Sequence, residues 1–144
     1  MSTQAANLHR RTFLKTAVSA GAAIIAAPHI IPSSALGKDG AVAPSERIVL
    51  GGIGIGNRGT YDLGCFLGQG DVQFVAVCDV KANRRNAVKQ IADQKYNNQD
   101  CQMYRDFREL LDRKDIDAVL IATGPNWHCT MASYAARAGK DMFC

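Results

Sequence analysis

The sequence predicts an α/β protein with a doubly wound parallel sheet, and three observations support that class. Short apolar runs of strand type alternate along the chain with segments that carry apolar residues at helical spacing. A glycine-rich turn connects the first apolar run to the first helical segment. Hydrophobic residues make up 47% and charged residues 21% of the 144 positions, which is typical of a globular domain. The last apolar run stops at Cys144, so we expect the sheet to be incomplete at its C-terminal end.

The first half of this alternation follows a linker at residues 38–45, where Gly40 and Pro44 favour irregular structure. Residues 47–53 and 72–78 are short apolar runs rich in β-branched side chains, so they predict two buried strands. Each run precedes a segment with apolar residues three and four positions apart. These segments predict two helices, at residues 60–67 and 82–96.

The second half repeats the pattern. It adds, in order, a short strand, a short helix, the clearest buried strand, a helix and a last apolar run, at residues 101–104, 106–111, 117–122, 127–138 and 141–144. Gly139 is well placed to end the longer helix. Because helices separate successive strands, we expect a parallel sheet with helices on both faces.

The first 37 residues have the layout of an export signal. Arg10 and Arg11 precede a weakly hydrophobic, alanine-rich stretch at residues 16–27, and small polar residues follow it. Residues 9–15 resemble the twin-arginine signal, with His9 in place of the usual serine. We therefore expect the twin-arginine export machinery to deliver the protein to the periplasm, with cleavage after residue 35 or 37. A surface amphipathic helix with two chance arginines is the alternative.

Most of the positive charge belongs to that segment. The chain has 17 Lys and Arg against 13 Asp and Glu, and removing residues 1–37 leaves 14 basic residues against the same 13 acids. This near balance gives no argument for nucleic-acid binding. No apolar run reaches the roughly 18 residues of a membrane-spanning helix. The five cysteines have neither C-x-x-C nor metal-ligand spacing, so we expect no metal site and no disulfide framework.

The glycine turn has the G-x-G-x-x-G spacing, in a segment that reads Gly54-Ile55-Gly56-Asn57-Arg58-Gly59. The first glycine permits a tight turn, the second lets the backbone approach a pyrophosphate, and the third lets helix and strand pack closely. The free N–H groups at the helix start attract phosphate, and Arg58 could add a direct contact. Residues 46–144 therefore predict a Rossmann-type dinucleotide-binding domain.

Asp79 supplies the second condition for this prediction. It ends the next strand, 20 residues after Gly59, where a carboxylate can accept hydrogen bonds from the ribose hydroxyls of NAD. Arg84 and Arg85 follow closely and could accept a 2′-phosphate, so NADP remains an alternative cofactor. Glycines 52, 54 and 56 also match the G-x-G-x-G of S-adenosylmethionine-dependent methyltransferases. That alternative is weakened because Leu50 stands where those enzymes usually carry an acid.

From about residue 46 onward the chain resembles the N-terminal domain of the Gfo/Idh/MocA family, the glucose–fructose oxidoreductase and inositol dehydrogenase family. The matching segments are residues 53–59, 76–80 with Arg84, 104–111, 116–119, 121–123, 127–128 and 136–141. The resemblance implies hydride transfer between NAD or NADP and a carbinol carbon, with a sugar or polyol as substrate.

The family pattern A-T-P-[ND]-x-W-H corresponds here to Ala122-Thr123-Gly124-Pro125-Asn126-Trp127-His128. By this resemblance Thr123, Asn126 and His128 border the cofactor. His128 is also a candidate proton carrier, because imidazole titrates near neutral pH. The alternative for His128 is that it orders the start of the helix.

The family's catalytic lysine lies in an E-K-P motif directly after a strand like residues 140–144, so we expect it beyond Cys144 together with a second, substrate-binding domain. We therefore interpret the chain as a truncated member and assign no catalytic residue within it. Two further interpretations stay open beside the oxidoreductase domain: a nucleotide-binding fragment or remnant without catalysis, and the methyltransferase. Assembly into a homo-oligomer is also left open.

Overall fold

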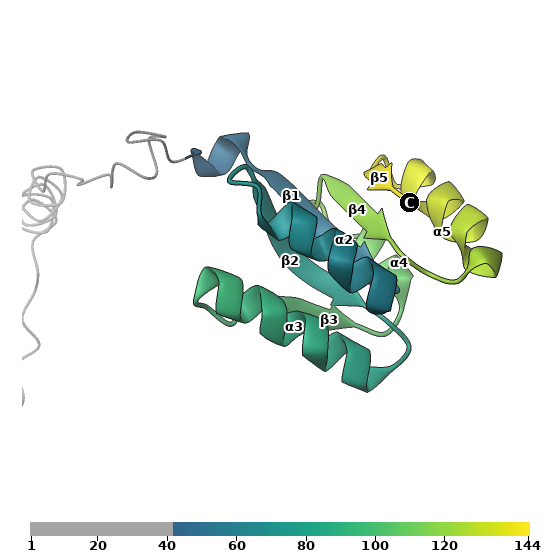
Figure 1. Cartoon of the computed structure of the whole chain (residues 1–144). Coiled ribbons are helices and arrows are strands. Elements are labelled where there is room, and N and C mark those ends of the chain that lie inside the picture. The colour runs from purple at the N-terminus through teal and green to yellow at the C-terminus, as the bar shows by residue number, and fades with distance from the viewer. Residues whose placement is uncertain (1–41) are drawn as a thin grey trace, which may run out of the picture. The chain divides into compact units, whose positions relative to one another are not determined.

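The computed structural model describes residues 42–144, which form a five-stranded sheet flanked by helices (Figure 1). The expected export signal and the first half of the expected linker, residues 38–41, lie outside the described residues. The elements follow one another as a 3-10 helix η2 (Pro44–Glu46), β1 (Ile48–Ile53), α2 (Asn57–Leu67), β2 (Val72–Cys78), α3 (Ala82–Tyr96), β3 (Gln102–Tyr104), α4 (Phe107–Leu111), β4 (Ala118–Ile121), α5 (Pro125–Arg137) and β5 (Asp141–Phe143).

The sheet has the strand order β3-β2-β1-β4-β5, and every neighbouring pair is parallel. The chain winds outward from β1 to β3 on one side, then returns to place β4 on the other side of β1. The carboxyl ends of β1 and β4 therefore meet where the winding reverses, which is the position where open α/β sheets bind ligands. The predicted doubly wound parallel sheet is confirmed.

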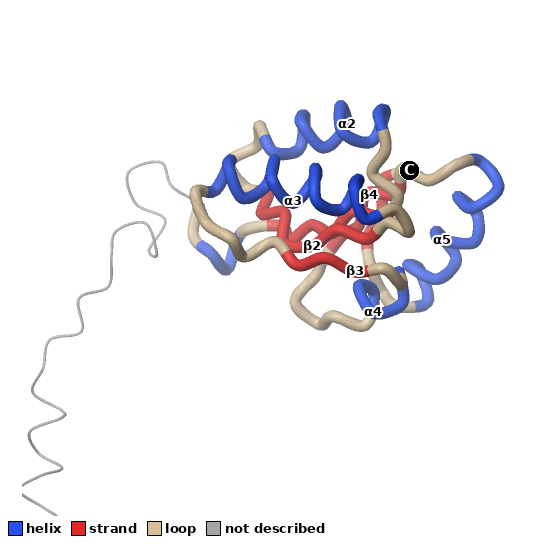
Figure 2. Tube along the Cα trace, turned by 90° about the horizontal axis from the view of Figure 1, so that it is seen from below, coloured by secondary structure: helices blue, strands red, loops and turns tan. Residues whose placement is uncertain are grey.

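Helices cover both faces of the sheet, and each face has its own core (Figure 2). On one face α2 and α3 pack over the sheet, with Leu63 and Val88 among the buried residues. On the other face α4 and α5 contribute Leu110, Met131 and Ala135. Successive strand residues such as Val119 and Leu120 belong to opposite cores, because side chains alternate across a strand.

Several helical bounds differ from the expectation. Helix α5 begins at Pro125, two residues before the predicted start, and α4 begins at Phe107, one residue after it. Helix α2 begins at Asn57, three residues earlier than predicted, because Gly56 is its N-cap and the Gly56 carbonyl accepts the Thr60 N–H at 2.8 Å. The glycine turn thus leads directly into the helix. A 3-10 helix, Pro44–Glu46, occupies the end of the predicted linker, with proline at its first position. By contrast, β2 and α3 have the predicted bounds.

Helix α5 ends as the sequence predicts, because Gly139 adopts a left-handed φ of 69° after the helix. Strand β5 pairs with β4, and its three residues are exposed in the described part of the chain. Within residues 42–144, no helix combines the length and apolarity needed to cross a membrane.

Candidate functional site

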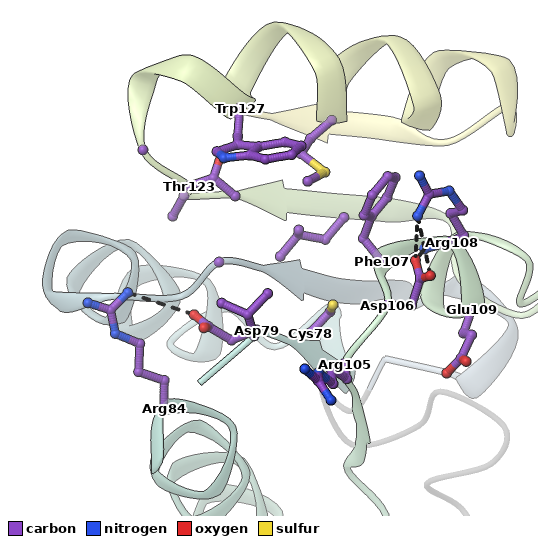
Figure 3. Close-up of a pocket in the computed structure, with 16 residues that line it drawn as sticks. Cys78, Asp79, Arg84, Arg105, Asp106, Phe107, Arg108, Glu109, Thr123 and Trp127 are labelled. Atoms are coloured by element: carbon purple, nitrogen blue, oxygen red, sulfur yellow. Dashed lines mark hydrogen bonds and ion pairs between the residues drawn. The ribbon is translucent and has the colours of Figure 1, made fainter. Parts of the chain in front are cut away.

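A pocket of about 570 Å³ opens at the carboxyl ends of β1, β2 and β4 (Figure 3). Four of the predicted site residues line it, namely Gly54, Asp79, Arg84 and Thr123. The remaining lining residues come from the same strand ends, from the segment after β3 and from α5. They are Ile53, Cys78, Val80, Arg105, Asp106, Phe107, Arg108, Glu109, Ala122, Gly124, Trp127 and Met131.

Gly54 sits where β1, β2 and β4 come together, and no other residue type fits there. Its φ is +71°, a conformation that side chains rarely adopt. A Cβ at this position would collide with the methyl carbon of Thr123 and lie 3.0 Å from the Thr123 Cα. The Gly54 N–H also donates to the Cys78 carbonyl at 2.8 Å. The first glycine therefore allows the tight turn that the sequence predicts.

The other two glycines of the turn differ in their surroundings. A Cβ on Gly59 would lie only 2.6 Å from the Cβ of Ala122, so this glycine lets α2 pack closely against β4. Gly56 has a φ of −92°, which any residue tolerates. A Cβ there would meet only the guanidinium of Arg84, with its nearest atom, Nη1, at 3.3 Å. The absence of a side chain at Gly56 thus keeps open space at the start of α2.

Asp79 is a buried carboxylate at the end of β2, with 6% of the residue exposed. Its Oδ1 accepts the Lys81 N–H at 2.8 Å, and its Oδ2 lies 3.8 Å from Nη1 of Arg84. Within residues 42–144 it is the one charged residue in the buried class. Because a buried charge is costly without partners, the free lone pairs of this carboxylate favour a ligand that donates hydrogen bonds, such as a ribose diol.

The two arginines after β2 have different roles. Arg85 donates from Nη1 to the Asp79 carbonyl oxygen at 2.6 Å, so its guanidinium holds the backbone at the strand end. The side chain of Arg84 is 45% exposed and lies between Asp79 and Gly56. Arg84 is therefore the arginine with freedom to contact a ligand in the pocket.

Thr123 follows β4 and has an unusual polar environment. Its Oγ1 is buried and has no hydrogen-bond partner among the described residues, although the residue lines the pocket. Its carbonyl oxygen lies 2.5 Å from Nε2 of His128. A buried hydroxyl without a partner is costly, so the site fits a ligand that supplies the missing hydrogen bond.

His128 itself does not line the pocket, and its ring is instead within hydrogen-bonding distance of the Thr123 carbonyl before α5. Asn126, also expected at the cofactor, is exposed and lies outside the lining residues. The adjacent Trp127 does line the pocket and is 57% exposed, so its ring is accessible to a ligand. The sequence indicated Trp127 only through its place in the family motif.

The remaining predicted residues lie near the glycine turn but outside the pocket. Ile55 is buried in the core below α2. Asn57 is the exposed first residue of α2. Arg58 pairs with Asp62 on its own helix at 3.0 Å and stacks over Tyr61. The structure thus does not aim the Arg58 guanidinium at the pocket.

The segment after β3 contributes lining residues that sequence reasoning missed. Asp106 caps α4 by accepting the Arg108 N–H at 2.9 Å, and this bond, assisted by the Arg108 guanidinium, lowers the pKa of Asp106. The Arg108 guanidinium stacks over the rings of Phe107 and Tyr134. An aspartate three residues before Glu109 resembles a capping box, which was the available signal for a helix start here.

Cys78 lines the pocket but is no nucleophile. Burial, followed by the negative charge of Asp79, raises the pKa of its thiol to about 12. The side chain is therefore neutral at physiological pH and acts as a small apolar wall. In the described part of the chain no group of three or more His, Cys, Asp or Glu side chains could hold a metal ion.

These features fit a dinucleotide. The start of α2 has no side-chain cap, so its N–H groups are available for phosphate, while Asp79 and Thr123 offer an acceptor and a hydroxyl in one pocket. The fold and site together define a nucleotide-binding domain of the doubly wound α/β class.

Comparison with known proteins identifies the family. Residues 48–144 match the Gfo/Idh/MocA family, described as an oxidoreductase family with an NAD-binding Rossmann fold. The chain belongs to this family, and its domain is the one that binds the nicotinamide dinucleotide. The match also decides against the methyltransferase alternative.

Individual relatives agree with this assignment. The chain is 35% identical to the alpha-N-acetylgalactosaminidase of Shewanella oneidensis, over 95% of this chain and 33% of that protein. It therefore spans about a third of the length of this curated relative. A putative myo-inositol dehydrogenase from Sinorhizobium meliloti is 29% identical with a TM-score of 0.59, over 67% of this chain and 27% of that one.

A structure with bound cofactor shares the fold. The scyllo-inositol dehydrogenase of Lactobacillus casei, solved with NAD(H) and scyllo-inositol, matches with a TM-score of 0.58 at 22% identity, over 67% of this chain and 27% of that one.

Proposed function

We propose that this domain holds NAD in an exported oxidoreductase that transfers hydride between the nicotinamide and a sugar or polyol. The observation that carries the proposal is the convergence of Gly54, Asp79 and Thr123, from three separate strands, on one pocket where the winding of the sheet reverses. The similarity to a putative myo-inositol dehydrogenase, at 29% identity over 67% of this chain, supports a polyol as the substrate class.

Each part of the site has a defined task in cofactor binding. Asp79 accepts hydrogen bonds from the adenosine ribose, and the uncapped N-terminus of α2 donates to the phosphates. Thr123 donates its hydroxyl, and Trp127 offers an apolar surface at the pocket mouth. When bound, the nicotinamide supplies a hydride acceptor or donor for a carbinol carbon.

Within this proposal Asp79 favours NAD over NADP, because its carboxylate repels a 2′-phosphate. Arg84 reduces this discrimination, since its cationic group lies 3.8 Å from the carboxylate and is exposed enough to turn toward a phosphate. Catalysis is not assigned to His128, because the Nε2 of its ring is already engaged by the Thr123 carbonyl.

Glycoside hydrolysis with a nicotinamide cofactor is a second candidate function. It is favoured by the relative named alpha-N-acetylgalactosaminidase, whose 35% identity extends over 95% of this chain. Some glycosidases depart from the usual two-carboxylate mechanism and depend on NAD, so a Rossmann domain is compatible with this activity.

Export to the periplasm is part of the proposal and rests on Arg10, Arg11 and the alanine-rich stretch after them. The Shewanella relative is similar over 95% of this chain, so the similarity includes residues before Val42, where the proposed signal lies.

Two measurements on the full-length protein test these functions. Titration with NADH, followed by the change in nicotinamide fluorescence, should show saturable binding; its absence would contradict the whole assignment. Turnover is then measured with a polyol panel and with an aryl α-N-acetylgalactosaminide. Net reduction of added NAD⁺ to NADH in the presence of a polyol supports the oxidoreductase. Release of the aryl group without net NADH supports the glycosidase, and cofactor binding without either reaction supports a nucleotide-binding remnant.

A further inference from the structure

We infer that His128 is a positioning residue for cofactor binding, acting through the backbone of Thr123. The hydrogen bond from its ring to the Thr123 carbonyl holds the connection between β4 and α5 in the conformation that presents the Thr123 hydroxyl to the ligand. This inference rests on the proposed function, because the ligand in question is the nicotinamide dinucleotide.

The connection has few other constraints. Strand β4 ends at Ile121, and its last backbone contact with β1 is the Ala122 N–H to the Ile53 carbonyl at 2.9 Å. Gly124 is the N-cap of α5 and provides no capping side chain, and Pro125 has no N–H to donate. The His128 side chain, reaching back five residues, therefore provides a link between the first turn of the helix and the end of the strand.

The link acts on the residue whose side chain the pocket needs. Thr123 packs its methyl group against Gly54, where the lack of a Cβ leaves just enough room for it. Its buried Oγ1 has no partner among residues 42–144. A shift of the Thr123 backbone would move the hydroxyl relative to the glycine turn, and a ligand hydrogen bond depends on such geometry within a few tenths of an ångström.

The chemistry of the link also determines the proton on the ring. A carbonyl oxygen only accepts hydrogen bonds, so Nε2 of His128 is the protonated nitrogen when the ring is neutral. The imidazolium form would donate at the same atom. The link consequently needs an N–H donor at this position but does not need a titrating group, and a glutamine amide can replace it.

The first experiment compares donor and non-donor variants of the full-length protein by NADH fluorescence titration and thermal melting. His128→Leu removes the donor and should weaken NADH binding about three- to tenfold, the range expected for one net hydrogen bond. His128→Gln, which can reach the carbonyl, should restore affinity to within about twofold, whereas the shorter His128→Asn should not. Ser133→Ala, an exposed position on the same helix, is the matched control and should bind as wild type.

The second experiment asks whether His128 acts through Thr123. Thr123→Val removes the hydroxyl, and in that background His128→Leu should have little further effect on NADH affinity, so the two changes should be non-additive.

Equal NADH affinity in His128→Leu and wild type, or additive effects in the double variant, would overturn the inference while leaving the proposed function intact. If His128→Leu fails to fold, the NADH affinities of His128→Gln and His128→Asn test the inference instead. Equal NADH affinities in these two variants would overturn the inference. Failure of wild type to bind NADH would overturn the proposed function and this inference with it.

Discussion

Asp79 and Arg84 face each other at the edge of the pocket, with the carboxylate Oδ2 3.8 Å from the guanidinium Nη1. The same guanidinium lies on the side of Gly56 to which a Cβ would project (Figure 3 shows the Asp79–Arg84 pair). One exposed cation therefore lies beside both the acid and the glycine turn that we propose bind the ribose and the phosphates. A bound dinucleotide would have to share or displace it, so Arg84 influences which cofactor enters.

Replacing Asp79 should change the ribose preference. Asp79→Ala removes the buried acceptor and should weaken NAD binding about tenfold or more, while NADP loses less because the repulsion of its 2′-phosphate disappears as well. Fluorescence titration with both reduced cofactors measures the ratio. Asp71→Ala, an exposed acid at the opposite end of β2, is the control. Unchanged NAD affinity in the Asp79 variant would make this residue a structural acid only.

Neutralising each of the two arginines after β2 should affect cofactor binding differently. Arg84→Gln should weaken NADP binding about tenfold and NAD binding less, because a charge-assisted contact with a 2′-phosphate is lost. Arg85→Gln should leave the ratio of the two dissociation constants close to that of wild type, since this guanidinium is bound to the Asp79 carbonyl. The opposite pattern in the two titrations would assign the phosphate contact to Arg85.

A methyl group at position 56 should leave folding largely unchanged but should weaken cofactor binding. Its negative φ and the flexible Arg84 neighbour mean that Gly56→Ala should change the free energy of unfolding by about 1 kcal/mol or less. NADH binding should fall about tenfold or more, because the methyl group takes the space of the phosphate oxygens. Melting curves with and without saturating NADH test this, and wild type should gain more melting temperature than the variant.

The control for this prediction is Gly64→Ala, in the exposed middle of α2, where a Cβ meets open space. It should raise stability by up to about 1 kcal/mol and leave the cofactor-induced shift unchanged. A Gly56→Ala protein with the full wild-type shift would show that this turn does not hold the pyrophosphate.

A side chain at position 54 should destabilise the fold. Gly54→Ala combines a positive φ with a collision against Thr123 and should lower the free energy of unfolding by about 3 kcal/mol or more. Gly139→Ala has a similar φ of +69° in open space and should cost only the conformational part, about 1 kcal/mol. Denaturant unfolding of both variants gives the difference. Equal losses would mean that the crowding against Thr123 is relieved without cost.

Export should depend on the arginine pair. Changing Arg10 and Arg11 together to lysine should leave the protein in the cytoplasm with its first 35 or 37 residues attached, because the twin-arginine machinery reads this pair. Cell fractionation and the mass of the purified protein measure location and cleavage. Processed periplasmic protein from the double variant would contradict the export proposal.

Sequence reasoning predicted the architecture because its signals are local. The apolar run at β2 and the periodic segment at α3 define elements whose bounds the structure confirms. The need for glycine at position 54 follows from turn geometry within a few residues, and Asp79 could be found because it directly ends an apolar run. The start of α2 was placed too late because the glycine turn, read as a loop, already contains the N-cap of the helix.

Tertiary structure decided which of the candidate side chains meet. Asn126 and Arg58 belong to the predicted motifs but lie outside the pocket, and Arg84 rather than Arg85 is free to face a ligand. The contribution of α4 and the link from His128 to Thr123 were likewise settled only by the fold. The sequence by itself therefore predicted the class of fold, which the structure confirms, and the edge of the sheet at which we propose that the cofactor binds. The direction of each side chain depends on its rotamer and on neighbours from distant segments, which spacing along one chain does not encode.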